Sequence, residues 1–126
     1  MSVGGTTRWP VELRLKKAEK LIDVAFDDGT HFRLAAEYLR VESPSAELQG
    51  HGAGQKTILG ERAHVGILDL EPVGNYAVRI KFDDLHDTGI YSWDYLYQLG
   101  IEQDRRWPTY LTALAARGLS REPKRG

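Results

Sequence analysis

Residues 11–26 of the chain read VELRLKKAEKLIDVAF, and this stretch decides the fold. Apolar and charged residues alternate over its first seven positions, which predicts a half-buried strand. The alternation returns in its last six positions, and the three residues between the two runs are few enough for an antiparallel hairpin. An Asp-Asp-Gly turn signal follows at 27–29, before a further strand pattern at 30–34. We therefore expect a three-stranded β-meander.

A second hairpin is predicted further along the chain. The strongest later strand patterns cover Ala63 to Glu71 and Tyr76 to Phe82, and Pro72-Val73-Gly74-Asn75 forms the turn between them. A short helix is expected at 35–40. Residues 43–61 collect Ser, Pro, Gly, Gln and His, so we expect an extended loop there, with Gly50 to Gln55 as a flexible surface segment or, alternatively, a backbone nest for an anion.

Two helices are predicted in the last third of the chain. Ser92 is a suitable N-cap for a helix that ends at Gly100, preceded by a short apolar piece at 90–91. Pro108 suits the first position of a second helix that runs to Arg117, with Gly118 as its stop. The expected fold class is α+β: a small single domain in which the hairpins and meander form one twisted sheet, packed on one face by these helices.

The amino-acid composition excludes several classes of function. The chain has 126 residues, of which 41% are hydrophobic and none is cysteine, so one domain of ordinary size forms without disulfides, cysteine-bound zinc, a thiol nucleophile or a CxxC redox pair. A net charge of -1 argues against a basic nucleic-acid binder. No apolar run is long enough to span a bilayer. We expect a flexible lead-in at 1–9, a domain at 10–119 and a polar tail at 120–126, in a cytoplasmic protein without membrane partners.

Four segments carry a resemblance to a known family. They are LRVESPSAE at 39–47, GHG at 50–52, EPVGNYA at 71–77 and GIYSWDYL at 89–96. With these motifs the chain resembles the domain of unknown function 971 family, also called the gamma-butyrobetaine hydroxylase-like N-terminal domain. The resemblance extends over roughly Pro10 to Arg121, because Trp107, Tyr110, Leu111 and Gly118 match the terminal helix of that family.

The resemblance implies an accessory role. The family occurs as stand-alone bacterial proteins, fused to Mrp/ApbC-type P-loop ATPases that carry iron–sulfur clusters, and at the N-terminus of carnitine-pathway 2-oxoglutarate oxygenases. In the oxygenases it binds a structural zinc through three cysteines and one histidine. The cysteine positions match Ser43, Ser45 and Leu48 here, and the histidine matches His86. Because a hydroxyl is a poor substitute for a thiolate and leucine offers no ligand, we expect this chain to fold without that zinc.

A weaker metal site is the main alternative. Asp84, His86 and Asp87 lie within a short acidic stretch that also contains Asp83, and carboxylate with imidazole is a ligand set that Fe or Zn accepts. His51 and His64 join such a cluster only if the loop folds back over the second hairpin. The plain reading is a solvated turn, with Asp87 just upstream of a helix start where negative charge is favourable.

Catalysis is not expected from this chain. It has no Gly-x-Ser-x-Gly elbow and no local triad pattern, and its serines fall in predicted turns and caps. We therefore expect a non-catalytic accessory or adaptor protein that has no required cofactor and binds a protein partner: by resemblance, an iron–sulfur assembly ATPase. The alternatives are a metal-binding domain that uses His86 with a nearby aspartate, and a detached regulatory subunit of a 2-oxoglutarate oxygenase.

Overall fold

The computed structural model describes residues 9–44, 60–84 and 89–122. Within these residues the strands are β1 (Pro10–Lys16), β2 (Leu21–Phe26), β3 (His31–Ala35), β4 (Ile67–Val73), β5 (Ala77–Phe82) and β6 (Gly89–Ser92), and the helices are α1 (Ala36–Val41), α3 (Trp93–Ile101) and α4 (Gln103–Ala116). The α+β class is confirmed. None of the described helices is long and apolar enough to cross a membrane.

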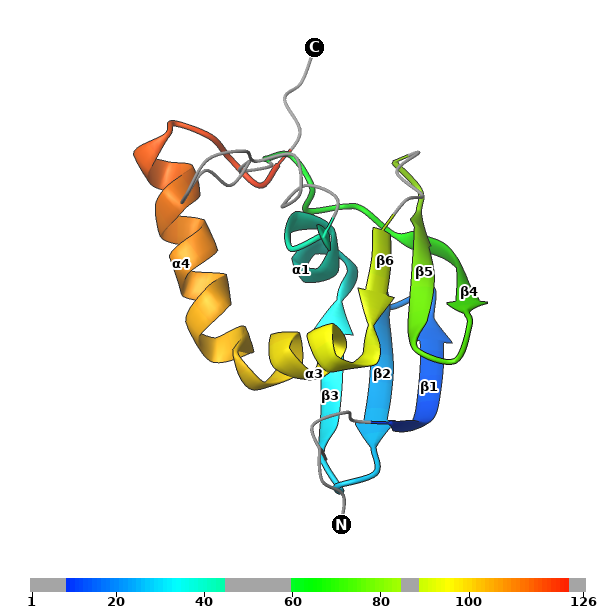
Figure 1. Ribbon diagram of the computed structural model, residues 1–126. Helices are drawn as coiled ribbons and strands as arrows, with labels where there is room; N and C mark the ends of the chain where they lie inside the picture. The colour runs from blue at the N-terminus through cyan, green and yellow to red at the C-terminus, as the bar shows by residue number, and fades with distance from the viewer. Residues whose placement is uncertain (1–8, 45–59, 85–88, 123–126) are drawn as a thin grey trace.

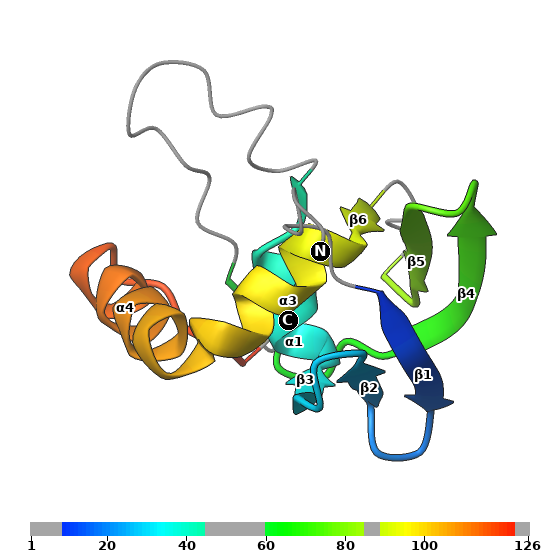
Figure 2. The ribbon, with the colours of Figure 1, turned by 60° about the horizontal axis from the view of Figure 1, so that its bottom comes forward.

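The strands in the described part of the chain form two sheets instead of the one we expected. Antiparallel ladders give the orders β1-β2-β3 and β4-β5-β6, and Figure 2 shows the two sheets facing each other at an angle. The expected hairpins are present, but Ile90 and Tyr91 belong to a further strand, β6, that pairs with β5. The predicted alternation in the meander is confirmed, since Leu13 lies opposite Val24 and Leu15 opposite Ile22.

The core explains why there are two sheets. Apolar side chains from the inner face of each sheet meet those of α1 and α3 in one buried cluster, which includes Ile22, Val24, Phe26, Leu34, Tyr38, Leu39, Val78, Ile80, Phe82, Tyr91, Leu96 and Leu99. The chain leaves β3 directly into α1, which lies between the sheets and α4 (Figure 1). A single flat sheet would leave one of these apolar faces in water, whereas two facing sheets bury both.

Helix α4 does not cover the sheet as expected. Tyr110 and Leu114 pack instead on Val41, with Trp107 against them, so α4 contacts the end of α1. In both ribbon views α4 lies on the far side of α1 from the second sheet (Figures 1 and 2). Arg106, near the start of this helix, therefore faces Glu42 at the end of α1 and not a sheet.

Three sequence-based boundaries were wrong for local reasons. The strand expected from Ala63 begins only at Ile67, because Val65 N bonds Arg62 O in a turn. Helix α3 runs past Gly100, whose role is close packing: a Cβ there would lie 2.4 Å from Phe32. Helix α4 begins at Gln103 and contains Pro108, because the Glu102 carbonyl accepts the amides of Arg105 and Arg106 and starts the helix earlier. Gly118, with φ of 67°, follows the end of α4 as expected.

Candidate functional site

The candidate site surrounds helix α1, a six-residue helix whose residues are all buried although two of them are charged. Glu37 and Arg40 lie in the helix, and the buried Glu42 and Ser43 follow it directly. A buried charge is costly unless it is paired, so this sequence requires partners from elsewhere in the chain. We call α1, Glu42, Ser43 and the groups that contact them the α1 polar cluster.

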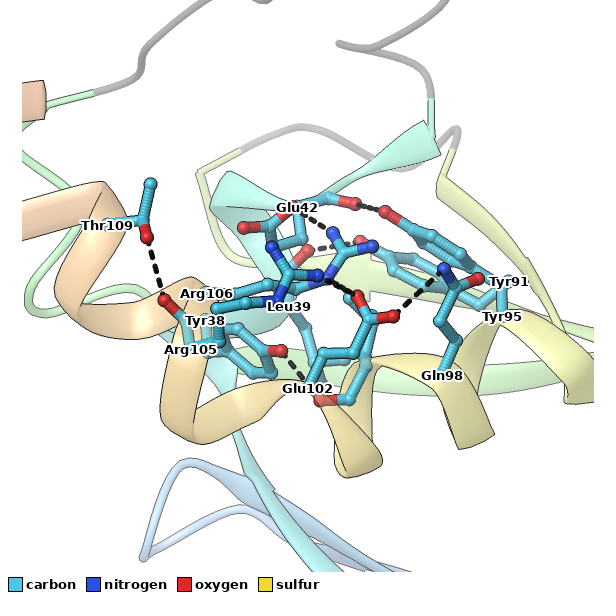
Figure 3. Close-up of polar contacts among 11 residues, drawn as sticks. Tyr38, Leu39, Glu42, Tyr91, Tyr95, Gln98, Glu102, Arg105, Arg106 and Thr109 are labelled. Atoms are coloured by element: carbon cyan, nitrogen blue, oxygen red, sulfur yellow. Dashed lines mark hydrogen bonds and ion pairs between the residues drawn. The ribbon is translucent and has the colours of Figure 1, made fainter.

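Tyrosine hydroxyls supply the first set of partners (Figure 3). Tyr91 donates to the Leu39 carbonyl at 2.5 Å, and Tyr95 donates to the Glu42 carbonyl at 2.6 Å. The last carbonyls of a helix have no partner within the helix, so these two phenols satisfy acceptors that would otherwise be buried and unpaired. Tyr38, on α1 itself, donates in the other direction to the Leu99 carbonyl of α3 at 2.6 Å.

A chain of ion pairs forms the second set. The Arg106 guanidinium is 2.9 Å from the Glu42 carboxylate, whose side chain is only 5% exposed, and it also donates to Glu102 at 2.7 Å. Burial acts to lower the pKa of Arg106, but the Glu102 hydrogen bond and the Glu42 charge prevail and raise it. The hydrogen bond from Arg106 in turn lowers the pKa of Glu102. These charges fasten the α3–α4 junction to the end of α1 (Figure 3).

Asp84, one of the predicted metal ligands, lies between two arginines. Its Oδ2 atom accepts from Arg40 Nε at 2.8 Å and is 3.0 Å from Arg62 Nε. His86 and Asp87 lie outside the described residues, so the predicted Asp84, His86 and Asp87 site stays a prediction. Within the described residues no group of three His, Cys, Asp or Glu side chains is placed to hold a metal ion. A cation at Asp84 would compete with two guanidinium groups for the same carboxylate.

Of the positions that match the family's zinc ligands, Ser43 is the one that the structure describes. It is fully buried, and its hydroxyl hydrogen-bonds to Tyr91. Ser45, Leu48 and His86 lie outside the described residues, as does His51. The remaining histidine considered for a metal cluster, His64, is exposed and lies 2.7 Å from the Glu122 carboxylate. The segment after α1 is thus held at Ser43 by packing and a hydrogen bond.

The cluster's chemistry is that of fixed donors and acceptors. Burial raises the pKa of both Tyr38 and Tyr91 far above the ordinary value, and it raises the pKa of Tyr110 to about 12. These phenols therefore stay protonated near neutral pH, and Tyr38 and Tyr91 donate their hydrogens to main-chain carbonyls. The acidic groups Glu42 and Glu102 are engaged by Arg106. The arrangement positions main-chain and charged groups rigidly.

The site also brings together motifs that lie far apart in the sequence. Tyr91 and Tyr95 of the stretch at 89–96 donate hydrogen bonds to the carbonyls of Leu39 and Glu42, which lie in the first half of the stretch at 39–47. Trp93 of the same stretch donates its indole N–H to Asn75 O at 3.0 Å and its main-chain N–H to Tyr76 O at 3.1 Å. The motif at 89–96 therefore joins those at 39–47 and 71–77 through hydrogen bonds to main-chain carbonyls, while the motif at 50–52 lies outside the described residues.

The motifs that the structure joins also lie within the part of the chain that matches a known family. A family model described as gamma-butyrobetaine hydroxylase-like, N-terminal, matches residues 13–97, a range that includes all three joined motifs. The chain belongs to this family. Among curated proteins, none matches the chain. The family has also been named the DUF971 family, as in the crystal structure of an Acidithiobacillus ferrooxidans protein of unknown function.

Solved structures of similar proteins share the fold. Two structures determined by NMR in solution are 42% and 41% identical to this chain, with TM-scores of 0.82 and 0.81. The first comparison covers 95% of this chain and 94% of the other, and the second covers 98% and 92%. The Acidithiobacillus ferrooxidans protein is 36% identical with a TM-score of 0.61, over 79% of this chain and 98% of its own. The fold of these two NMR structures therefore extends over nearly the whole of this chain.

Sequence reasoning missed several members of the α1 polar cluster. Glu102 and Arg106 fell in a stretch that we expected to precede the last helix, and Arg121 fell in the expected polar tail. One feature of the sequence could have indicated these residues. The short helix α1 carries Glu37 and Arg40 between apolar residues, so it buries both charges, and each buried charge requires a partner of opposite charge.

Proposed function

We propose that this protein is a non-catalytic accessory or adaptor domain that acts through protein contacts. The observation that carries the proposal is the state of the α1 polar cluster, the best-developed group of buried polar side chains among the described residues. Its phenols donate to main-chain carbonyls and its carboxylates are paired with arginines. Because the polar groups of this cluster bond to one another, they stiffen the fold beneath the surface. Within the cluster they leave no acid, base or nucleophile available for catalysis.

The setting we propose is iron–sulfur cluster assembly beside an Mrp/ApbC-type ATPase. Support comes from the family: domains of this kind occur fused to such ATPases, and a stand-alone copy is suited to meet the same partner as a separate chain. A rigid scaffold fits this role, because a preformed surface loses little conformational entropy when it binds. Large apolar side chains are exposed on several elements, and these include Leu68 on β4, Ile101 on α3 and Leu111 on α4.

Affinity purification from the native cell extract tests the proposal. The full chain serves as bait, and the enrichment of an Mrp/ApbC-type ATPase over a tag-only control is measured by quantitative mass spectrometry. We expect at least tenfold enrichment. Recovery of a 2-oxoglutarate oxygenase in its place would favour the regulatory-subunit alternative, and enrichment of neither would contradict the proposal.

Three surface variants then locate the contact. Leu68→Ser, Ile101→Ser and Leu111→Ser each remove one exposed apolar side chain, so each is expected to fold like the parent chain. An apolar anchor near the centre of an interface contributes about 2 kcal/mol or more, which is a loss of roughly thirtyfold in affinity. We expect one of the three variants to lose the ATPase while the other two retain it, and these two then serve as matched controls.

A further inference from the structure

Residues 119–122, which follow α4, contact three separate parts of the chain, and we call these three parts together the slot. Its floor is the buried Glu37 of α1, whose side chain is 7% exposed. One wall is the main chain of residues 60–63, and the other is the indole ring of Trp107 on α4. The slot is distinct from the tyrosine and Arg106 contacts at the other end of α1.

The main chain of 119–122 is held by contacts that any sequence can make. Glu61 N donates to Ser120 O at 2.8 Å, and Ala63 N donates to Arg121 O at 3.0 Å. Gly60 permits this close approach, because a Cβ at that position would lie only 2.9 Å from Ser120 O. In bound peptides, main-chain hydrogen bonds of this kind supply affinity and side-chain contacts supply specificity.

Arg121 is the side chain of this segment that the slot contacts specifically. Arg121 donates from Nε and Nη2 to the two carboxylate oxygens of Glu37, both at 2.8 Å, and its guanidinium lies 5.5 Å from the centre of the Trp107 ring. A paired fork of hydrogen bonds with an aromatic face alongside is selective for arginine over lysine. Glu122 adds a contact to His64 at 2.7 Å.

The occupant is bound like a ligand and not like a core segment. Even with its guanidinium engaged, the Arg121 side chain is 45% exposed, and Leu119, Ser120 and Glu122 are exposed as well. Because all four residues are exposed, the segment is held mainly by hydrogen bonds and the Glu37 ion pair. An exposed segment opens locally more easily than a core segment, but the buried Glu37 then requires another arginine in place of Arg121.

We propose that this slot is a peptide-binding site for an arginine-bearing segment of a partner protein, and that residues 119–122 occupy it in cis until the partner displaces them. The partner's arginine takes the place of Arg121 on Glu37 and Trp107, and its main chain takes the two amides of residues 61 and 63. The tethered segment competes at an effective concentration of about 1 mM, so it sets a threshold for binding in trans. The inference goes beyond the accessory role and does not depend on it.

A titration of the full chain tests the inference. The probe is the acetylated and amidated pentapeptide GLSRE, which copies residues 118–122 and carries a single arginine. Binding is followed by NMR through the amides of Glu61 and Ala63 and the indole N–H of Trp107. In the Arg121→Ala chain, where the cis arginine is absent, we expect saturable shifts of these signals. We expect at least tenfold weaker binding to the unmodified chain and to the control peptide GLSAE.

Two further variants make the result decisive. Arg121→Lys keeps the positive charge but loses the paired hydrogen bonds to Glu37, so we expect this variant to bind GLSRE with intermediate affinity. It replaces Arg121→Ala in the titration if that variant fails to fold. Adding Gly60→Ala to either variant places a methyl group against the peptide main chain and is expected to weaken binding at least tenfold. Equal binding of GLSRE and GLSAE, or equal binding with and without Arg121, would overturn the inference. None of these measurements involves an assembly protein, so their failure would leave the accessory role untouched.

Discussion

The phenol of Tyr91 donates a 2.5 Å hydrogen bond to the main-chain carbonyl of Leu39, two residues that lie 52 positions apart in the sequence. Tyr91 comes from the short strand β6, and Leu39 from the buried helix α1. The bond therefore ties the second sheet to the end of the helix that follows the first sheet. Because both groups are buried, neither can turn to water if the other is removed.

Removal of this hydroxyl should destabilise the fold. The substitution Tyr91→Phe leaves the ring in the core but strips the Leu39 carbonyl of its donor, and a buried unpaired acceptor costs about 1–3 kcal/mol. Urea unfolding measured by circular dichroism reports the change. Tyr76→Phe is the matched control, because Tyr76 is 58% exposed and should change the free energy of unfolding by less than about 0.5 kcal/mol. Equal stability of the two variants would contradict a structural role for the Tyr91 bond.

The two adjacent arginines at the start of α4 should behave differently. Arg106→Ala leaves the buried Glu42 carboxylate without its guanidinium, and breaking a buried pair costs about 3–5 kcal/mol. Arg105→Ala removes an arginine that contacts the same Glu102 but is 68% exposed, so the expected loss is below about 1 kcal/mol. Thermal unfolding of both variants checks the difference. A similar loss of stability in both variants would contradict a stabilising role for the ion pair between Arg106 and Glu42.

Much of the fold was predictable because it depends on local pattern. The alternation at 11–17 and 21–26 sets the meander, and Ser92 caps α3 as its side chain predicts, accepting a hydrogen bond from Tyr95 N. The second sheet and the position of α4 were not predictable in the same way. Ile90 and Tyr91 form too short a stretch to indicate a strand, and they become one only because β5 supplies the ladder.

The candidate site was predictable only in part. Asp84 is the second residue of the acidic stretch after β5, but nothing local to it indicates that Arg40 and Arg62 would approach it from other segments. The start of α4 was misplaced because Pro108 is a strong helix-start signal, while the Glu102 carbonyl that receives the first amides carries none. Long-range pairing of charges depends on the finished fold, and a single sequence contains no direct record of it.

Acid should weaken the second sheet through Glu71. Hydrogen bonds from Lys81 and Arg79 lower the pKa of this carboxyl from its ordinary value of 4.5. A carboxyl with a lowered pKa in the folded state stabilises the fold above its unfolded pKa, and this contribution is lost as the pH falls through the folded value. We expect the urea midpoint of Glu71→Gln to lie below that of the unmodified chain at pH 7. The two midpoints should converge as the pH falls through the lowered pKa of Glu71, because both side chains then become neutral; a constant gap at every pH would exclude this origin.

Metal content separates the accessory role from the metal-binding alternative. We expect the untagged protein to hold well under one equivalent of Zn or Fe by mass spectrometry of the elements, because Asp84 is engaged by two arginines. Stoichiometric metal that disappears in both His86→Ala and Asp87→Asn would contradict this expectation and establish the alternative site. Asp84→Asn provides a comparison, since it removes a predicted ligand and an arginine partner together.

Direct binding to the proposed partner is the sharpest test of the accessory role. The purified chain is mixed with the purified Mrp/ApbC-type ATPase of the same cell, with and without its iron–sulfur cluster, and the complex is measured by sedimentation velocity. The account predicts a complex at micromolar concentrations that dissociates when the one apolar side chain identified among Leu68, Ile101 and Leu111 is replaced by serine. Free sedimentation of both proteins at the highest attainable concentration, with the ATPase in either state, would contradict it.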